Sequence, residues 1–250
     1  MIRLSKRLAA AASYVIAGET AADIGTDHAL LPVALVQRGI VPRAVAADVR
    51  EGPAQAAQRQ VSSAGLADRI DVRIGDGLSV LAPGEAGTVV IAGMGGGTIR
   101  DILERAGKAL EGVRRLVLQP NTGERLVREW LAERDWKLAA ETLLEEDGVY
   151  YEVLAADRAV SAGEAVEWNR ELYAPVPDSP VSTSAKLAMG PYLMREAGPL
   201  FFAKWEANLS KLERLLAKIG RSSQPEALRR YRELAGERNE IREVLTWLSK

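Results

Sequence analysis

Apolar and polar positions alternate in two rhythms along the chain up to about Asp157. Short apolar runs rich in β-branched residues predict strands at 20–25, 44–49, 71–74, 88–92 and 116–119. The stretches between them place apolar side chains on one helix face, at 31–38, 53–64, 98–110 and 123–134. Because strands alternate with helices in βαβ units, the pattern predicts a parallel sheet.

The alternation ends in two strand-like runs, 136–144 and 149–156, that have no helix between them. The residues between the runs include Asp147 and Gly148, a pair that favours a tight hairpin turn. A parallel sheet closed by an antiparallel last strand is the layout of class I methyltransferases. We therefore expect an α/β fold with a Rossmann-like sheet of this class, although a fold does not by itself define a function.

The remainder of the chain has a helical pattern. A proline-rich connector, 173–182, precedes apolar positions spaced by three and four residues from Trp205 to Ile219 and from Leu228 to Leu248. The polar stretch 220–225 separates the two series, so the pattern predicts a coiled-coil-like helical hairpin. We expect a sheet domain at 1–158, followed by the connector and helical hairpin at 159–250.

The N-terminus has basic residues followed by small apolar ones, which is also the pattern of a signal peptide. A helix is favoured, because Leu4, Leu8, Ala11, Ala12 and Val15 fall on one face. No apolar run approaches the roughly 18 residues that span a bilayer. With no cysteine and one histidine, we expect a cytoplasmic protein without a metal site. The sequence does not define the oligomeric state.

Basic residues are concentrated in the helical part of the chain. Between Lys204 and Arg232 there are eight basic and three acidic residues, although the net charge of the chain is −1. The ordinary interpretation is a solvated helix surface, and the functional one is a surface that contacts phosphates. The candidate RNA contacts are Lys211, Arg214, Lys218 and Arg221, with Arg3, Lys6 and Arg7 near the N-terminus.

The loop after the first predicted strand carries the only histidine in the chain, His28. Gly25 allows a tight turn and the close approach of a ligand. Asp27 stands where a dinucleotide fingerprint has its second glycine, and a carboxylate there would repel a pyrophosphate. Asp27 could accept hydrogen bonds from an ammonium group or face a sulfonium. His28 either contacts a substrate or caps the following helix.

The loops after the second and third strands carry further acids. Asp48, followed by Val49, ends its strand 23 residues after Gly25, a place typical of the acid that binds the ribose of an adenosine. A cap for the next helix is the alternative. Asp76 and Gly77 occupy the place that contacts an adenine edge in methyltransferase sheets, or they form a simple turn.

The loops after the fourth and fifth strands add glycines and an amide. Gly93 and Met94 lie in a glycine-rich segment that either cradles a phosphate or lets a methyl donor and a base approach each other. Asn121 offers an amide near the same edge, or it caps the next helix. Because the strands are parallel, all these loops should meet at the carboxyl edge of one sheet.

Several strings occur in order along the chain: ADIGTDHALLP, EGP, GDGL, AGMGG, LQPN, EEDGVYYEV and, before the hairpin, MGPYLMRE. Together they resemble the bacterial TrmK family, S-adenosylmethionine-dependent enzymes that methylate N1 of adenine 22 in tRNA. The resemblance implies that the sheet domain binds the donor and that the helical arm helps to hold tRNA. This chain differs from the family at Leu30, where relatives often have a tyrosine. The sequence has no NPPY-type tetrapeptide, the motif common among amino-group methyltransferases, which fits a ring nitrogen as the target.

With this resemblance, catalysis should rest mainly on positioning and electrostatics, with Asp27 stabilising the positive charge or the amino group of the adenine. The candidate catalytic residues are Asp27, His28 and Asn121. The candidate residues for binding the donor are Gly25, Asp27, Asp48, Val49, Asp76, Gly77, Gly93 and Met94. Three alternatives stay open: a methyltransferase for another RNA site or a small molecule, a nicotinamide-dependent dehydrogenase, and a non-catalytic RNA-binding module.

Overall fold

The protein is described by a computed structural model that covers residues 2–221 and 224–250. The described chain divides into two compact units between Asn169 and Arg170. The last strand ends at Arg158, where the sheet domain was expected to end, and helix α6 (Ala162–Tyr173) spans the division. The sequence pattern did not predict α6. The functional roles of the two parts remain a prediction.

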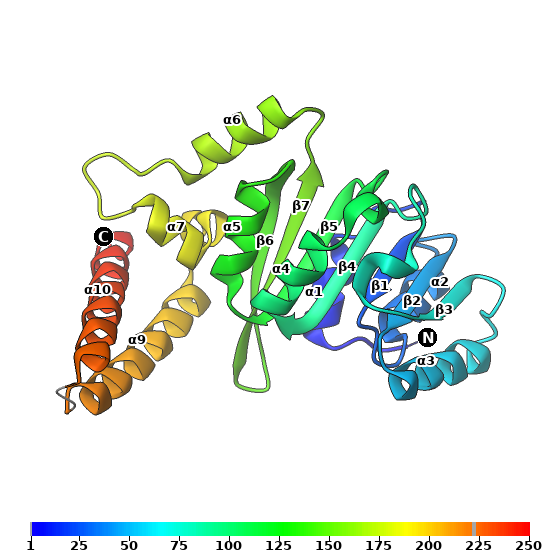
Figure 1. Cartoon of the computed structure of the whole chain (residues 1–250), viewed down its shortest axis with the longest axis horizontal. Helices are drawn as coiled ribbons and strands as arrows, with labels where there is room; N and C mark the ends of the chain where they lie inside the picture. The colour runs from blue at the N-terminus through cyan, green and yellow to red at the C-terminus, as the bar shows by residue number, and fades with distance from the viewer. Residues whose placement is uncertain (1, 222–223) are drawn as a thin grey trace. The chain divides into compact units, whose positions relative to one another are not determined.

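The first unit contains one seven-stranded sheet of order β3-β2-β1-β4-β5-β7-β6 (Figure 1). Strands β1 to β5 are parallel to one another, and β7 is antiparallel to both β5 and β6. The predicted fold class is therefore confirmed. The strands are β1 (Ala21–Ile24), β2 (Ala44–Asp48), β3 (Ile70–Ile74), β4 (Thr88–Gly95), β5 (Arg115–Thr122), β6 (Trp136–Glu146) and β7 (Val149–Arg158).

The turn between β6 and β7 follows directly from its two residues. Asp147 and Gly148 both have positive φ, 52° and 75°, and Glu146 pairs with Val149 on either side of them. Two consecutive residues with positive φ match the right-handed twist of a hairpin, which is why aspartate followed by glycine is favoured there. The hairpin expected from the sequence is present.

Helices cover both faces of the sheet. One face is covered by α1 (Lys6–Ser13), α2 (Leu30–Gln37) and α3 (Glu51–Ser63), and the other by α4 (Gly96–Glu104) and α5 (Glu124–Ala132). Two 3₁₀ turns accompany them, η1 (Gly77–Val80) and η2 (Gly107–Leu110). The helix expected at 98–110 is thus interrupted, because Gly107 has a φ of 51° and cannot continue an α-helix.

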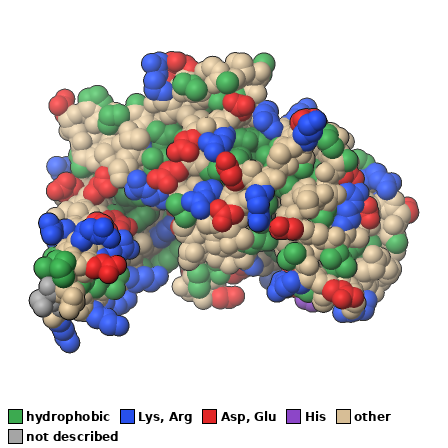
Figure 2. Space-filling view, in the orientation of Figure 1, with side chains coloured by type: hydrophobic (Ala, Val, Ile, Leu, Met, Phe, Trp, Pro, Cys, Tyr) green, Lys and Arg blue, Asp and Glu red, His purple; other side chains and the backbone are tan. Residues whose placement is uncertain are grey.

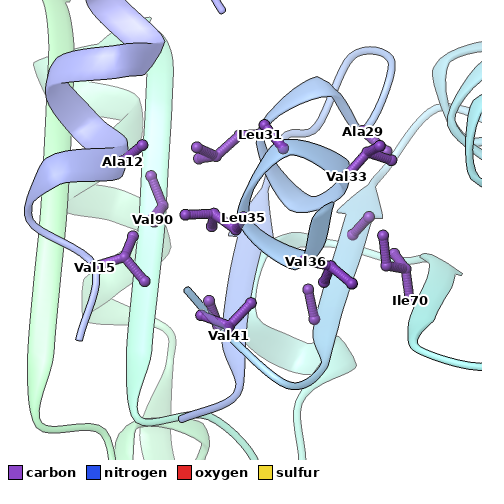
Figure 3. Packing of buried hydrophobic residues seen from close by; sticks show 14 of the residues in the cluster. Ala12, Val15, Ala29, Leu31, Val33, Leu35, Val36, Val41, Ile70 and Val90 are labelled. Carbon is purple, nitrogen blue, oxygen red and sulfur yellow. The ribbon is translucent and has the colours of Figure 1, made fainter. Parts of the chain in front are cut away.

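The core beneath α1 and α2 depends on small side chains in the central strands. β1 and β2 are buried along their whole length and contain five alanines, so the helices approach the sheet closely. Leu31 and Leu35 of α2 pack near Val90 of β4, with Ala12 and Val15 nearby (Figure 3). Strands buried on both faces are expected to be nearly continuously apolar, and the exceptions in these two strands are Asp23 and Asp48.

Helix α5 is attached to the β6–β7 hairpin by a buried charged cluster. Arg128 of α5 is fully buried, and its Nε donates to Oε1 of Glu141 in β6 at 2.6 Å. Its Nη2 donates to Oε2 of Glu152 in β7. One cation thus holds two carboxylates on adjacent strands where water is excluded.

The second unit is helical. It contains α7 (Thr183–Met189), α8 (Pro191–Arg195), α9 (Pro199–Ile219) and α10 (Pro225–Leu248). α9 and α10 pack together and bury Leu212 and Leu216 of the first helix, as the spacing predicted. In α10 the expected Ile241 and Leu245 are buried, whereas Leu228 and Tyr231 of the predicted series are exposed and Leu234 is buried instead. Ser222 and Ser223, within the turn expected at 220–225, lie outside the described residues. None of the described helices is long and apolar enough to cross a membrane.

Replacing Arg128 with methionine should keep most of the side-chain volume but leave two buried carboxylates without their cation. We expect the free energy of unfolding, measured by urea titration with tryptophan fluorescence, to fall by about 3–5 kcal/mol. The matched control is Arg125→Met on the same helix, where the partly exposed pair with Glu129 is worth at most about 1 kcal/mol. Equal losses in the two variants would contradict the assignment.

Candidate functional site

The loops at the carboxyl ends of β1, β2, β4 and β5 line a cavity of about 660 Å³, together with residues of α1 and α2. The cavity lies where β1 is flanked by β2 on one side and β4 on the other. At this point the connections turn to opposite sides of the sheet, and open α/β sheets bind their ligands there.

Two buried carboxylates line this cavity. Asp23 at the end of β1 and Asp48 at the end of β2 are only 8% and 5% exposed. Burial raises the pKa of Asp23 to about 6, the nearby charge of Asp48 adds to the rise, and Thr26 offsets part of it. Oδ1 of Asp48 accepts the backbone N–H of Arg50 at 2.8 Å. A pair of buried acids favours a ligand that brings a positive charge and hydroxyl groups.

The loop after β1 brings backbone and a hydroxyl to the same cavity. The N–H groups of Gly25 and Thr26 both donate to the carbonyl of Ala47 at 2.8 Å, which fixes the loop against β2. Gly25 has a φ of 81°, a conformation that glycine adopts without strain. Oγ1 of Thr26 is buried beside Asp23, and its interaction with that carboxylate lowers the pKa of Asp23 against the effect of burial.

Asp27 and His28 lie at the mouth of the cavity. Their side chains are 77% and 56% exposed, and Nε2 of His28 lies 3.6 Å from Oδ2 of Asp27. The N-cap of α2 is Ala29, which has a φ of 51° and no side-chain cap. The alternative that His28 caps this helix is therefore wrong. Both side chains are therefore accessible from solvent at the mouth of the cavity.

The ends of β4 and β5 are joined by an amide cluster. The Gly93 N–H donates to Oε1 of Gln119 at 3.1 Å, and Nδ2 of Asn121 donates to the Gly93 carbonyl at 2.9 Å. Asn121 belongs to β5, and the N-cap of α5 is Gly123. The alternative that Asn121 caps α5 is therefore wrong. Gly93, Met94 and Asn121 all line the cavity, as expected for the carboxyl edge.

Arg7 of α1 also lines the cavity. Its Nη1 donates to Oε1 of Gln119 at 3.2 Å and to Oδ1 of Asn121 at 3.3 Å. Its neighbour Lys6 has a different environment, because its Nζ donates to the carbonyl of Glu145 in β6. The sequence grouped Arg7 with the outer RNA contacts, whereas the structure places it among the residues around the cavity.

Asp76 and Gly77 line a separate, smaller cavity of about 140 Å³. The Asp76 carboxylate lies 3.6 Å from Nη2 of Arg105. At the ends of β2 and β3, Val49 and Ile74 are 61% and 60% exposed, which leaves apolar surface near Asp48, the register partner of Ile74. The structure does not bring Val49, Asp76 and Gly77 into the lining of the larger cavity.

Sequence reasoning missed Asp23, Thr26 and Ile74. An acid within the apolar run AADI was the available signal for Asp23, since an ionisable residue in a fully buried strand needs a reason to be there. No cluster of three or more histidine, aspartate or glutamate side chains that could hold a metal ion occurs within the described ranges.

The strand order, the antiparallel β7 and the acid-lined cavity beside β1 define a Rossmann-like protein of the class I methyltransferase type. The model of the TrmK family, tRNA (adenine(22)-N(1))-methyltransferase, matches residues 21–243, and the chain belongs to this family. The predicted family resemblance is confirmed.

Known relatives extend over nearly the whole chain. The tRNA (adenine(22)-N(1))-methyltransferase of Bacillus subtilis (strain 168) is 38% identical over 245 residues, which cover 98% of each chain. The crystal structure of the B. subtilis M1A22 tRNA methyltransferase TrmK has a TM-score of 0.87 at 37% identity and covers 98% of this chain and 99% of that one. A Streptococcus pneumoniae structure in complex with S-adenosyl-L-methionine has a TM-score of 0.79 at 34% identity, with coverage of 97% and 100%.

Substituting Asp23 with asparagine should stabilise the ligand-free protein in a pH-dependent way. The pKa of Asp23 in the folded state is about 6, above the ordinary 3.8, so the free energy of unfolding falls as pH rises between these values. Relative to the unsubstituted protein, we expect a gain of up to about 3 kcal/mol at pH 8 that vanishes below about pH 4.

Urea unfolding across this pH range measures the effect. Asp27→Asn is the matched control, because its solvated carboxylate should change stability by less than about 0.5 kcal/mol. A stability difference between the Asp23 variant and the unsubstituted protein that does not depend on pH would refute the raised pKa.

Proposed function

We propose that this chain transfers a methyl group from S-adenosylmethionine to N1 of adenine 22 in tRNA. The observation that carries the proposal is the cavity with its two buried acids, in a chain that matches a tRNA (adenine(22)-N(1))-methyltransferase along 98% of its length. A related structure of similar fold was determined with S-adenosyl-L-methionine bound.

The residues around the cavity fit this donor. Asp23 is the acid suited to the donor's ammonium, because its ionised form is costly until a positive charge lies beside it. Asp48 is suited to the ribose hydroxyls, since its carboxylate is buried at the end of β2. Val49 and Ile74 offer exposed apolar surface to the adenine, and Asp76 and Gly77 lie beyond them on the same sheet edge.

The chemistry needs little from the protein in the way of proton transfer. When bound, S-adenosylmethionine supplies an electrophilic methyl group on a positively charged sulfur. N1 of adenine has a free lone pair at neutral pH, so no general base is required, and the methylated base becomes a cation. Asp27 at the mouth of the cavity stabilises this positive charge electrostatically, and His28 beside it contacts the base or its phosphate.

Positioning is the other contribution. Gly25 and Gly93 leave room for close approach, and Asn121 fixes the Gly93 carbonyl from the neighbouring strand. Because N1 takes part in Watson–Crick pairing, a paired target adenine must leave its helix before it reaches Asp27 and His28. The exposure of these two side chains fits a base that arrives from outside the fold.

The helical hairpin is the candidate tRNA surface. Lys211, Arg214, Lys218 and Arg221 are exposed and recur at spacings of three and four residues, so they share one face of α9 and its C-terminal end. The buried Leu212 and Leu216 lie on a different face. No ion pair involves these four basic residues within the described parts of the chain. Figure 2 shows basic side chains gathered over the hairpin.

Three basic residues of α10 have a different environment. Arg229 and Arg230 both lie within 4.0 Å of Glu233, at 3.9 and 3.2 Å, and Arg242 pairs with Glu213 of α9 at 2.7 Å. Among the described residues, Arg232 and Arg238 of α10 have only neutral oxygens as hydrogen-bond acceptors, so α10 can add to the charge that the α9 face offers to phosphates. A small-molecule substrate would not need such a surface, which supports RNA as the substrate. A cytoplasmic location follows from this proposed substrate.

The experiment that tests the function is methyl transfer from labelled donor to unmodified tRNA transcripts, followed by digestion and identification of the nucleoside. We expect 1-methyladenosine, and we expect the product to disappear when adenine 22 of the transcript is changed to guanine. Transfer to a different position would reassign the RNA site. Donor binding without any transfer to tRNA would instead favour a small-molecule substrate.

The role of the α9 face in tRNA binding is tested by replacing Lys211, Arg214 and Lys218 together with glutamine. Each lost phosphate contact lowers the slope of log K against log salt by roughly 0.7–0.9, so we expect weaker tRNA binding and a slope smaller by up to about 3. Filter binding at several salt concentrations measures both quantities.

The matched control replaces Arg229, Arg230 and Arg242, which removes the same number of charges from residues that have carboxylate partners. We expect the control to change the salt slope by less than one unit. Donor affinity should stay unchanged in both triple variants. Equal slopes for the two variants would assign the effect to net charge and refute a specific role for the α9 face.

A further inference from the structure

Arg7 differs from the other basic residues around the cavity. Nε of Arg50 lies 3.3 Å from the Asp48 carboxylate, and His28 lies beside Asp27. Within the described residues, the Arg7 guanidinium has no carboxylate within 4.0 Å. Its hydrogen bonds to described residues go to the neutral amide oxygens of Gln119 and Asn121.

The surroundings hold this guanidinium in place. It lies over the ring of Tyr151 in β7, with 5.3 Å between Cζ and the ring centroid. A Cβ placed on Gly93 would lie 3.3 Å from Nη1 of Arg7, so the guanidinium lies close to the backbone at the end of β4. The α1 helix that carries Arg7 is followed by Tyr14, whose hydroxyl lies 2.6 Å from Oγ1 of Thr142 in β6. The position of the cation is therefore defined before any ligand binds.

The hydrogen bonding of Arg7 is incomplete. Nε is buried and has no partner among the described residues, although a guanidinium has five N–H donors. Neutral amide oxygens leave the charge of this half-buried guanidinium without a counter-charge, whereas a carboxylate or phosphate would neutralise it and accept two parallel N–H groups. The nearby acids Asp23 and Asp48 line the same cavity but do not pair with it.

We propose that Arg7 is an oxyanion-binding residue of the active site, so that the cavity offers an acid to a positive group and Arg7 to a negative one. This inference rests on the proposed methyl transfer, and the reaction supplies two oxyanions of matching chemistry. One is the α-carboxylate of the donor, which lies next to the ammonium assigned to Asp23. The other is a phosphate of the tRNA nucleotide that enters the cavity.

The experiment measures binding by the unsubstituted protein and by Arg7→Gln, with no catalytic step. Titration calorimetry compares S-adenosylmethionine with its decarboxylated analogue, which keeps the sulfonium, the ribose and the adenine. If Arg7 binds the carboxylate, we expect Arg7→Gln to weaken S-adenosylmethionine about tenfold or more and to leave the analogue unchanged. If Arg7 binds a phosphate, the affinities for both donors should stay unchanged. The affinity for tRNA should then fall, and the slope of log K against log salt should decrease by roughly 0.7–0.9, the value for one phosphate contact.

Two further variants separate binding from folding. Arg7→Lys keeps the charge and should retain most of the affected affinity. Lys6→Gln removes the neighbouring charge on α1, whose Nζ is bound to the Glu145 carbonyl outside the cavity, and should change neither donor affinity. The affinities of the unsubstituted protein for S-adenosylmethionine and for its decarboxylated analogue can also be compared directly. This comparison needs no variant, so it is independent of any effect of a substitution on folding.

The outcomes distinguish this inference from the function itself. Unchanged affinity of Arg7→Gln for both donors and for tRNA would overturn the oxyanion role, even if the unsubstituted protein forms 1-methyladenosine. Equal weakening of both donors would also overturn it, because the effect would then be independent of the carboxylate. Absence of methyl transfer by the unsubstituted protein would contradict the function, whereas a carboxylate-specific loss at Arg7 would still support the donor site.

Discussion

The burial of two aspartates at the ends of neighbouring strands governs the rest of the site. Asp23 and Asp48 end or nearly end β1 and β2, the two strands buried along their whole length. Such carboxylates stay ionised only if hydrogen bonds or a positive ligand compensate them. The Arg50 N–H serves Asp48, whereas Asp23 has its pKa raised to about 6. Asp23 therefore favours a ligand that places a positive charge beside its carboxylate.

Much of the fold could be predicted because it depends on local patterns. The β-branched runs, the helical faces between them and Asp147-Gly148 define the parallel sheet and its hairpin without knowledge of tertiary contacts. The helix break at Gly107 and helix α6 could not be predicted in this way. The first depends on a backbone angle that many glycines in helical patterns do not adopt, and α6 has a mixed face with exposed Val166 and Trp168.

The site was predicted at the level of loops but not of side chains. Parallel strands bring their carboxyl ends to one edge, so Gly25, Asp48, Gly93 and Asn121 were expected together and do line one cavity. Which acid faces inward was not accessible from the sequence. Asp27 attracted attention because it replaces a glycine, yet it is 77% exposed, whereas the acid within the strand is buried. Spacing along a loop does not determine the direction of a side chain.

The sequence is limited in the same way for charged residues, both on the helical hairpin and at the cavity. A count of basic residues does not show which of them have carboxylate partners, and the pair between Arg242 of α10 and Glu213 of α9 is evident only in the folded hairpin. A cation with such a partner must give it up before it can bind a phosphate, and this cost reduces the gain from the new contact. The positive charge available to phosphates is therefore smaller than the composition suggests, and the α9 face and Arg7 are two of the places that offer it. Contacts between exposed charges are weak and screened by salt, so the α9 face suits an extended phosphate surface that makes several such contacts. The half-buried Arg7 instead suits a single oxyanion at a fixed place.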